Sequence, residues 1–155
     1  MRTIRRRRFE NKTDYKSRFG LLKSGKPRLV IRKSNRYIVA QLITSNMAQD
    51  KVEINVLSKD LLANGWPKDK IGSLKSLAAA YLTGFLLAKK SKSKEAILDA
   101  GMYRSVKKSR IYAALKGAID GGMKIPHNVE SLPTMEDLKR NEKTAKLLEL
   151  TKEIK

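Results

Sequence analysis

The apolar residues in the first part of the chain follow the period of β-strands. Residues 29–31 form a short apolar run, residues 34–36 have the composition of a turn, and residues 37–43 resume the apolar pattern. After a polar stretch at residues 44–50, which we expect to be a loop, residues 52–57 come close to alternating apolar and polar positions. A period of two is typical of half-buried strands. The pattern therefore predicts three antiparallel strands.

Helical spacing follows these strands. Residues 60–64 are compatible with a short helix that ends at Gly65, because glycine suits a left-handed cap. A stronger helix is expected after Ser73, which we expect to cap it, since the apolar residues between 74 and 86 recur every three to four positions. Small residues on its other faces, such as Gly84, would allow close packing.

The remaining core elements are a strand and a helix. Residues 96–98 form a short apolar run ending at Gly101, and a strand that follows a helix is typical of a crossover to parallel pairing. Ser109 is expected to cap a last core helix with an apolar stripe over residues 111–119, ended by Gly121. The order βββαβα predicts an α/β fold: a mixed sheet with helices packed on it.

A chain of 155 residues has the size of one domain with one core. We predict three parts: a basic N-terminal extension over residues 1–24, an α/β core domain over residues 25–133 and a C-terminal helical tail over residues 134–155. In the tail, Thr134 precedes Asp137 with the spacing of a capping box.

The net charge of +20 indicates an anionic partner. Residues 1–36 hold 14 basic and two acidic residues, and residues 89–110 hold eight basic and two acidic residues, whereas residues 136–155 are nearly balanced. A polyanion is therefore expected to contact the first two stretches and largely to miss the tail.

The most concentrated charge is the run of four arginines at residues 5–8. Such a run can be a solvated face, but like charges without neighbouring acids favour an extended segment that becomes ordered on phosphate. Phe9, Tyr15 and Phe19 lie among the nearby basic residues. They are compatible both with stacking on RNA bases and with anchoring in the core.

Residues suited to catalysis are sparse, so we expect no enzyme, no metal site and no cofactor. His127 is the single histidine, cysteine is absent, and the carboxylates are scattered. Residues 20–27 match a phosphate-binding loop except at Pro27, which replaces the hydroxyl residue that would hold Mg²⁺. The segment also leads into a strand instead of opening a helix, so we reject nucleotide hydrolysis.

Neither secretion nor a membrane span is expected. Residues 1–10 lack the apolar stretch of a secretory signal, and the apolar run at residues 77–88 is well short of the roughly 20 residues that cross a bilayer. The absence of cysteine fits a reducing compartment.

Several motifs together resemble a known family, the large-subunit ribosomal protein L-eighteen family in its archaeal and eukaryotic branch. The likeness covers most of the chain and depends on the order and spacing of the motifs. These are Thr13-Asp14-Tyr15, Pro27-Arg28-Leu29-Val30 with Ser34-Asn35, Gln41, Ala79-Ala80-Tyr81-Leu82-Thr83-Gly84, Ile97-Leu98-Asp99, Ala113-Ala114-Leu115-Lys116-Gly117-Ala118, Asp120-Gly121-Gly122 and Ile125-Pro126-His127. The turn at residues 105–109 and the tail after Pro133 depart from the family pattern.

The resemblance implies a ribonuclease-H-like fold without catalysis, placed in the cytoplasm in the central protuberance of the large ribosomal subunit. The implied partners are 5S ribosomal RNA, 23S ribosomal RNA and neighbouring large-subunit proteins, with no membrane and no small-molecule substrate. The family's RNA-binding positions, together with further members of the two basic stretches, give the expected contact residues: Arg2, Arg5, Arg6, Arg7, Arg8, Lys12, Tyr15, Arg18, Lys23, Lys26, Arg28, Arg32, Asn35, Arg36, Lys89, Lys90, Arg104, Lys107, Lys108 and Arg110.

Two other functions remain as alternatives. A general nucleic-acid-compacting protein would also use charge without catalysis, and its preference between RNA and DNA would distinguish it. A nuclease on the same sheet architecture would require clustered acidic metal ligands.

Overall fold

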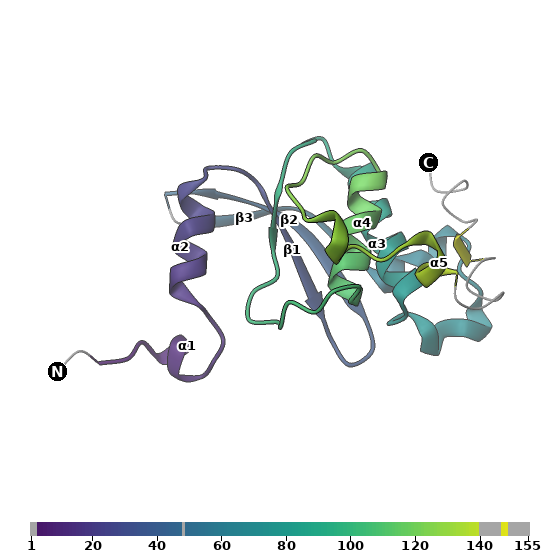
Figure 1. Ribbon diagram of the computed structural model, residues 1–155, viewed down its shortest axis with the longest axis horizontal. Helices are drawn as coiled ribbons and strands as arrows, with labels where there is room; N and C mark the ends of the chain where they lie inside the picture. Colours follow the sequence, from purple (N-terminus) through teal and green to yellow (C-terminus); the bar gives the residue numbers. More distant parts are fainter. Residues whose placement is uncertain (1–2, 48, 140–146, 149–155) are drawn as a thin grey trace.

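The described residues form a four-stranded sheet with mixed pairing (Figure 1). The computed structural model describes residues 3–47, 49–139 and 147–148. The strands are β1 (Arg28–Lys33), β2 (Ile38–Asn46), β3 (Gln49–Leu57) and β4 (Ile97–Asp99). β1 pairs antiparallel with β2 and parallel with β4, and β2 pairs antiparallel with β3, which gives the order β3-β2-β1-β4. The predicted mixed sheet is confirmed, including its parallel crossover strand.

Helices cover one face of this sheet, and a separate helix stands on the other side (Figure 1). The helices are α1 (Arg6–Phe9), α2 (Tyr15–Lys23), η1 (Ser58–Asn64), η2 (Lys68–Ser73), α3 (Leu77–Lys90), α4 (Arg110–Asp120), η3 (Val129–Ser131) and α5 (Met135–Leu138). α3 and α4 pack together and contact the sheet, whereas α2 lies near the N-terminus, away from them. The predicted core order βββαβα is confirmed, with short helices added between its elements.

Alternation along β1 separates the two faces of the sheet. Leu29 and Ile31 are fully buried in the core under α3 and α4. Because successive strand side chains point to opposite faces, Arg28, Val30 and Arg32 lie on the face toward α2. This second face carries the candidate site.

The two core helices approach each other through glycines. A Cβ atom added to Gly84 would lie 1.9 Å from the carbonyl oxygen of Ala114, and one added to Gly117 would lie 1.9 Å from that of Tyr81. Any side chain at these positions would force the helix backbones apart. The prediction that small residues allow close packing here is confirmed.

Two local predictions were wrong. The stretch expected to be a loop at residues 44–50 is mostly strand, because β2 continues to Asn46 and β3 begins at Gln49. The backbone hydrogen bonds between β2 and β3 hold this end of the hairpin together, although its side chains are polar. The side chain of Ser73 does not cap α3. Its hydroxyl donates to the carbonyl of Lys70 within the preceding turn, and Ser76 caps the helix instead.

The capping residues of α4 and α5 are the ones that the sequence predicts. Ser109 occupies the N-cap position of α4, although its side chain makes no capping hydrogen bond. Thr134 and Asp137 form the predicted capping box at the start of α5. The expected helical tail beyond residue 139 falls largely outside the described residues. Of that stretch, Leu147 and Leu148 are described and are buried in the core.

Candidate nucleic-acid interface

The run of four arginines was predicted to be extended, and this prediction is wrong. Arg6, Arg7 and Arg8 lie in the helical turn α1, and Arg5 occupies its N-cap position. Arg5 stacks over the ring of Tyr15, with its guanidinium carbon 4.8 Å from the ring centre. The carboxylate of Glu10 forms ion pairs with Arg6 Nε at 3.1 Å and with Lys12 Nζ at 2.7 Å. These contacts offset the repulsion within the run, so the segment folds locally while its arginines remain exposed.

Helix α2 continues the basic segment and is capped by Asp14. One carboxylate oxygen of Asp14 accepts from the backbone amides of Lys16 at 3.0 Å and Ser17 at 3.3 Å, and the other accepts from the Ser17 hydroxyl at 2.7 Å. The Ser17 side-chain and backbone hydrogen bonds are the main reason that the pKa of Asp14 is lowered. None of the residues of α2 is fully buried. The position of this helix therefore depends strongly on polar contacts.

Arg28 is placed differently from the expectation that it contacts RNA. It is 2% exposed and lies within the face of the sheet toward α2. Its Nη1 donates to Asp99 Oδ2 at 3.0 Å, and its Nη2 donates to Asp50 Oδ1 at 2.7 Å and to Ser45 Oγ at 3.2 Å. A buried guanidinium needs such partners, because an unpaired buried charge is very costly. Arg28 is consequently a structural residue and is not presented to a polyanion.

The same two carboxylates also hold surface arginines. Asp50 Oδ2 accepts from Arg18 Nη2 of α2 at 2.8 Å. Asp99 accepts from Arg32 through its backbone oxygen at 3.0 Å and through Oδ1 at 3.4 Å. Burial acts to raise the pKa of Asp50, but hydrogen bonds from Ser45, Arg18 and Arg28 outweigh it and lower that pKa to about 2. Asp50 therefore stays ionised at neutral pH.

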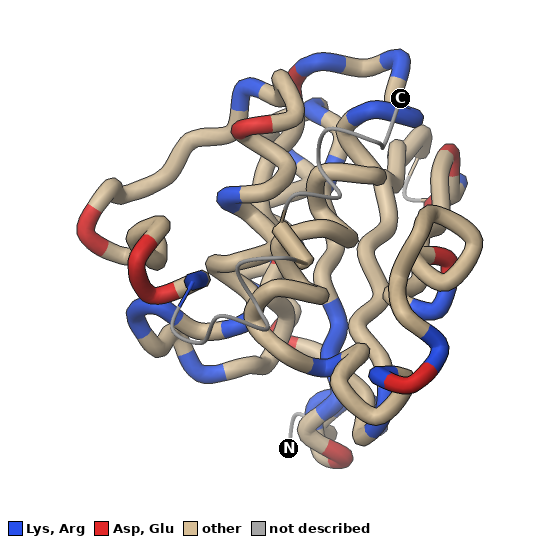
Figure 2. The backbone as a smooth tube through the Cα atoms, turned by 90° about the vertical axis from the view of Figure 1, so that its right-hand side faces the viewer, with Lys and Arg blue, Asp and Glu red and all other residues tan. Residues whose placement is uncertain are grey.

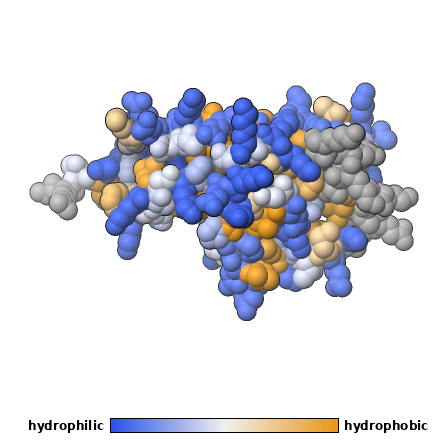
Figure 3. All heavy atoms as spheres, turned by 90° about the horizontal axis from the view of Figure 1, so that it is seen from above, coloured by the Kyte–Doolittle hydropathy of each residue, from blue (hydrophilic) through white to orange (hydrophobic). Residues whose placement is uncertain are grey.

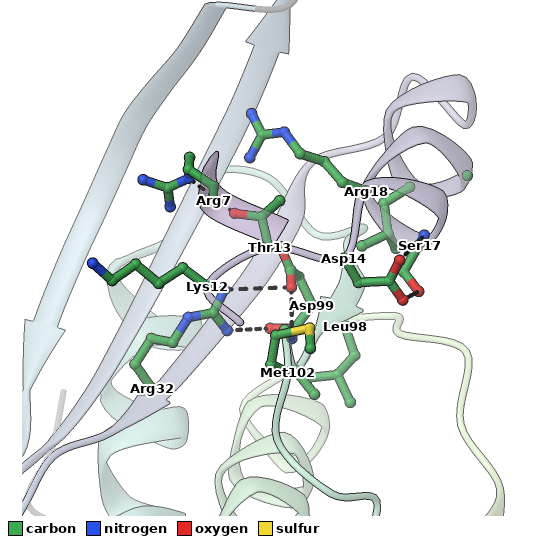
Figure 4. A pocket seen from close by; sticks show the side chains of 14 residues that line it. Arg7, Lys12, Thr13, Asp14, Ser17, Arg18, Arg32, Leu98, Asp99 and Met102 are labelled. Atoms are coloured by element: carbon green, nitrogen blue, oxygen red, sulfur yellow. Dashed lines mark hydrogen bonds and ion pairs between the residues drawn. The ribbon is translucent and has the colours of Figure 1, made fainter. Parts of the chain in front are cut away.

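A groove of about 430 Å³ lies between the N-terminal segment and the loop that follows β4 (Figure 4). Four cationic side chains line it: Arg7, Lys12, Arg18 and Arg32. Its two acidic residues already accept hydrogen bonds. Asp14 accepts from backbone amides at the start of α2, and Asp99 accepts from Arg28 and Arg32. Four cations against two acidic residues leave the lining of the groove with an excess of positive charge.

Exposed aromatic side chains accompany these cations. Phe9 is 78% exposed and Phe19 is 71% exposed, so the interpretation of these two as core anchors is wrong. On helix α2, Phe19 shares a surface stripe with Lys16 and Lys23, three and four residues away. An aromatic ring flanked by cations suits an unpaired base and its phosphates. Lys16 was missing from the predicted contacts, although this helical spacing could have indicated it.

The other predicted residues of the first stretch lie around the ends of the sheet. Asn35 and Arg36 are exposed in the β1–β2 turn, where the Ser34 hydroxyl accepts from the amides of Arg36 and Tyr37. Lys26 is exposed and pairs with Glu95 at 3.3 Å. Arg2 lies outside the described residues.

The second basic stretch forms a separate part of the surface. Lys89 and Lys90 are exposed at the end of α3, and none of the predicted cations of this stretch lines the groove beside α2. Two of them are paired with acids: Lys107 with Glu130 at 3.2 Å and Lys108 with Asp137 at 2.9 Å. Arg104 and Arg110 line a second groove with the exposed apolar residues of the loop before α4.

The positions of the charged residues along the backbone can be followed in Figure 2. Lys and Arg mark the N-terminal segment and several loops, while the helical centre of the molecule is mostly free of them. Figure 3 shows hydrophilic side chains projecting along much of the face seen from above, with apolar patches between them.

Other kinds of site are not evident among the residues that the structure describes. In that part of the chain, no three histidine, aspartate or glutamate side chains converge as metal ligands. Gly20 to Lys23 of the loop-like motif lie inside α2, so their amides are not arranged around a phosphate. None of the described helices has the length and apolar character needed to cross a bilayer.

Comparison with known proteins identifies the relatives of this chain. The sequence model of the ribosomal large subunit proteins 60S L5 and 50S L18 matches residues 1–96 and 88–128. The large ribosomal subunit protein uL18 of Korarchaeum cryptofilum is 48% identical over 151 residues, covering 96% of this chain and 75% of that protein. The uL18 protein of Methanospirillum hungatei is 44% identical, and the match covers 86% of this chain and 76% of that protein. The uL18 protein of Methanococcus maripaludis is 50% identical, and the match covers 79% of this chain and 63% of that protein. With its fold, its motifs and these matches, the chain belongs to the family of ribosomal large subunit proteins 60S L5 and 50S L18.

Proposed function

We propose that the protein is a structural constituent of the large ribosomal subunit that binds 5S ribosomal RNA and helps attach it to 23S ribosomal RNA in the central protuberance. Family membership supports the ribosomal role, and the resemblance of the motifs supports 5S ribosomal RNA as the partner. The protein acts without catalysis, alongside other large-subunit proteins, in cytoplasmic ribosomes.

The observation that carries this proposal is the groove beside α2, together with the exposed arginines of α1. Four cations converge on the groove from α1, α2, β1 and the segment between the two helices. Phosphate contacts supply most of the affinity for a nucleic acid and set its orientation. Arginine also binds phosphate in a bidentate manner. The exposed aromatic residues nearby supply flat surfaces for unpaired bases, which are common in folded RNA.

The proposed primary RNA-binding surface consists of the N-terminal segment, strand β1 and the segments that precede and follow β1. Arg28 is left out because it is buried, and Lys16 and Phe19 are added. The members are Arg2, Arg5, Arg6, Arg7, Arg8, Lys12, Tyr15, Lys16, Arg18, Phe19, Lys23, Lys26, Arg32, Asn35 and Arg36. The second stretch, with Lys89, Lys90, Arg104, Lys107, Lys108 and Arg110, supplies further contacts to the larger RNA.

The domain division follows from the same reasoning. Residues 1–24 act as the RNA-binding extension, residues 25–133 as the folded core and residues 134–155 as the tail. The α1 segment has no buried residues, so its role lies in binding and not in the stability of the core.

Competition binding at fixed salt tests the proposal. The purified protein is mixed with labelled archaeal 5S ribosomal RNA, and unlabelled 5S RNA or duplex DNA of equal length is added as competitor. We expect the RNA to compete at much lower concentration, because shape and unpaired bases add to the phosphate contacts. Equal competition would favour the alternative function of a general nucleic-acid-compacting protein.

A further inference from the structure

The buried Arg28 joins two carboxylates that come from distant parts of the chain. Asp50 is the second residue of β3, and Asp99 is the last residue of β4. β1 lies between β2 and β4, so Asp50 and Asp99 approach the guanidinium from different sides. Each bonds one of its terminal nitrogens, at 2.7 Å and 3.0 Å.

Each carboxylate uses its second oxygen for a surface arginine. Asp50 Oδ2 bonds Arg18, and Asp99 Oδ1 bonds Arg32. The result is a continuous chain of charges in the order Arg18, Asp50, Arg28, Asp99, Arg32. Both ends of this chain line the same groove, Arg18 from α2 and Arg32 from β1.

We propose that Asp50, Arg28 and Asp99 are positioning residues for RNA binding, because they hold Arg18 and Arg32 in place at the same groove, where both can contact phosphates of the RNA backbone. This inference rests on the proposed function. Without the chain of ion pairs, α2 would keep its charge but lose its defined place on the sheet, since none of its residues is fully buried. Preorganised side chains lose less entropy on binding and favour one geometry of phosphates over others.

Two simpler roles would give different results. If Asp50 only repelled RNA through its negative charge, its removal would strengthen binding to every nucleic acid. If it only stabilised the fold, its removal would lower the melting temperature and leave the preference for 5S RNA unchanged below that temperature.

The variant Asp50→Asn distinguishes these roles. Both oxygens of the carboxylate accept hydrogen bonds from guanidinium groups, whereas an amide presents an NH₂ donor at one of the two positions. One of the bridges, to Arg18 or to Arg28, must therefore break. The side chain of Asp50 is 28% exposed, so we expect the domain to remain folded.

A matched control removes the same charge elsewhere. Glu53 is an exposed acid of the same strand, outside the chain of ion pairs, and Glu53→Gln should strengthen binding to 5S RNA and to duplex DNA equally. Asp50→Asn should instead reduce the ratio of the two affinities by about tenfold, as expected for the loss of one charge-assisted hydrogen bond. Asp50→Glu, which keeps both acceptor oxygens, should restore part of that ratio.

The outcomes separate this inference from the proposed function. If wild-type protein shows no preference for 5S RNA, the proposed function fails. If the wild type shows the preference and Asp50→Asn retains it while remaining folded, the positioning role fails. Should Asp50→Asn not fold, Asp50→Glu provides the test, because it keeps the charge but moves both acceptor oxygens away from Arg18 and Arg28 by one methylene group. An unchanged ratio in that variant would overturn the inference.

Discussion

Replacing the four arginines at residues 5–8 by alanine should weaken binding to every RNA and flatten its dependence on salt. Each neutralised phosphate contributes about 0.7 to 0.9 to the slope of log affinity against log salt concentration. Arg6 is already paired with Glu10, so between three and four arginines are available to phosphates. The slope should therefore fall by about 2 to 3.5.

This fall has a measurable consequence. Between 50 and 200 mM salt, the gap in affinity between wild type and variant should narrow by about 15-fold to 130-fold. Alanine has the best helix propensity, so the α1 turn is expected to persist and the effect should come from charge. Fluorescence anisotropy with labelled 5S RNA at several salt concentrations measures both slopes.

A second variant controls for net charge. Four lysines between the two basic stretches lie outside the proposed surfaces: Lys59, Lys68, Lys70 and Lys75. Their replacement by alanine removes the same charge and leaves the proposed contacts unchanged. Their loss should change the slope far less. If the arginine variant keeps the wild-type slope, the four arginines form a solvated face, and the reasoning that assigns them to phosphate is refuted.

Four further predictions concern the fold and the site. Gly84→Ala should destabilise the domain by about 3 kcal/mol or more in urea unfolding, since its Cβ would overlap backbone of α4, whereas Gly72→Ala, with open space around it, should change little. Phe19→Ala should lower the preference for 5S RNA without altering the salt slope, and an unchanged preference would argue against stacking. Deleting residues 1–12 should weaken RNA binding but barely move the melting temperature; a large fall would place the segment in the core. The pKa of Asp50 is lowered to about 2, so its ion pairs should stabilise the fold above pH ~4 and be lost as the pH falls toward 2. In an acid titration followed by NMR, the signals of α2 should therefore change before those of α3.

The sequence predicts the core of the fold well because its elements have strong local patterns. The alternating strands, the apolar run of α3 and the stripe of α4 each bury one face, and glycines mark the ends of η1 and α4. Helix α2 was not predicted, since its residues are mixed in polarity and none is fully buried. The true cap of α3 was missed because Ser73 and Ser76 both precede the apolar run, and only the path of the preceding turn distinguishes them.

The candidate site depends on contacts between distant residues, which a local pattern does not contain. Arg28, Asp50 and Asp99 were interpreted as one surface cation and two scattered acids, yet the pairing of β1 with β4 and the β2–β3 hairpin bring them together. A parallel pairing of residues 96–98 was predicted without its partner strand, so the contact between Arg28 and Asp99 did not follow from the sequence until β1 was known to be that partner. The position of Asp50 did not follow either, because residues 44–50 were expected to be a loop.

Ultraviolet cross-linking in ribosomes tests the central claim most directly. Large subunits carrying this protein are irradiated, and the cross-linked peptides and nucleotides are identified by mass spectrometry. We expect cross-links from residues 5–36, including Phe19 and Tyr15, to 5S ribosomal RNA, with 23S ribosomal RNA contacts elsewhere on the protein. Absence of the protein from large subunits, or cross-links that leave 5S RNA untouched, would contradict it.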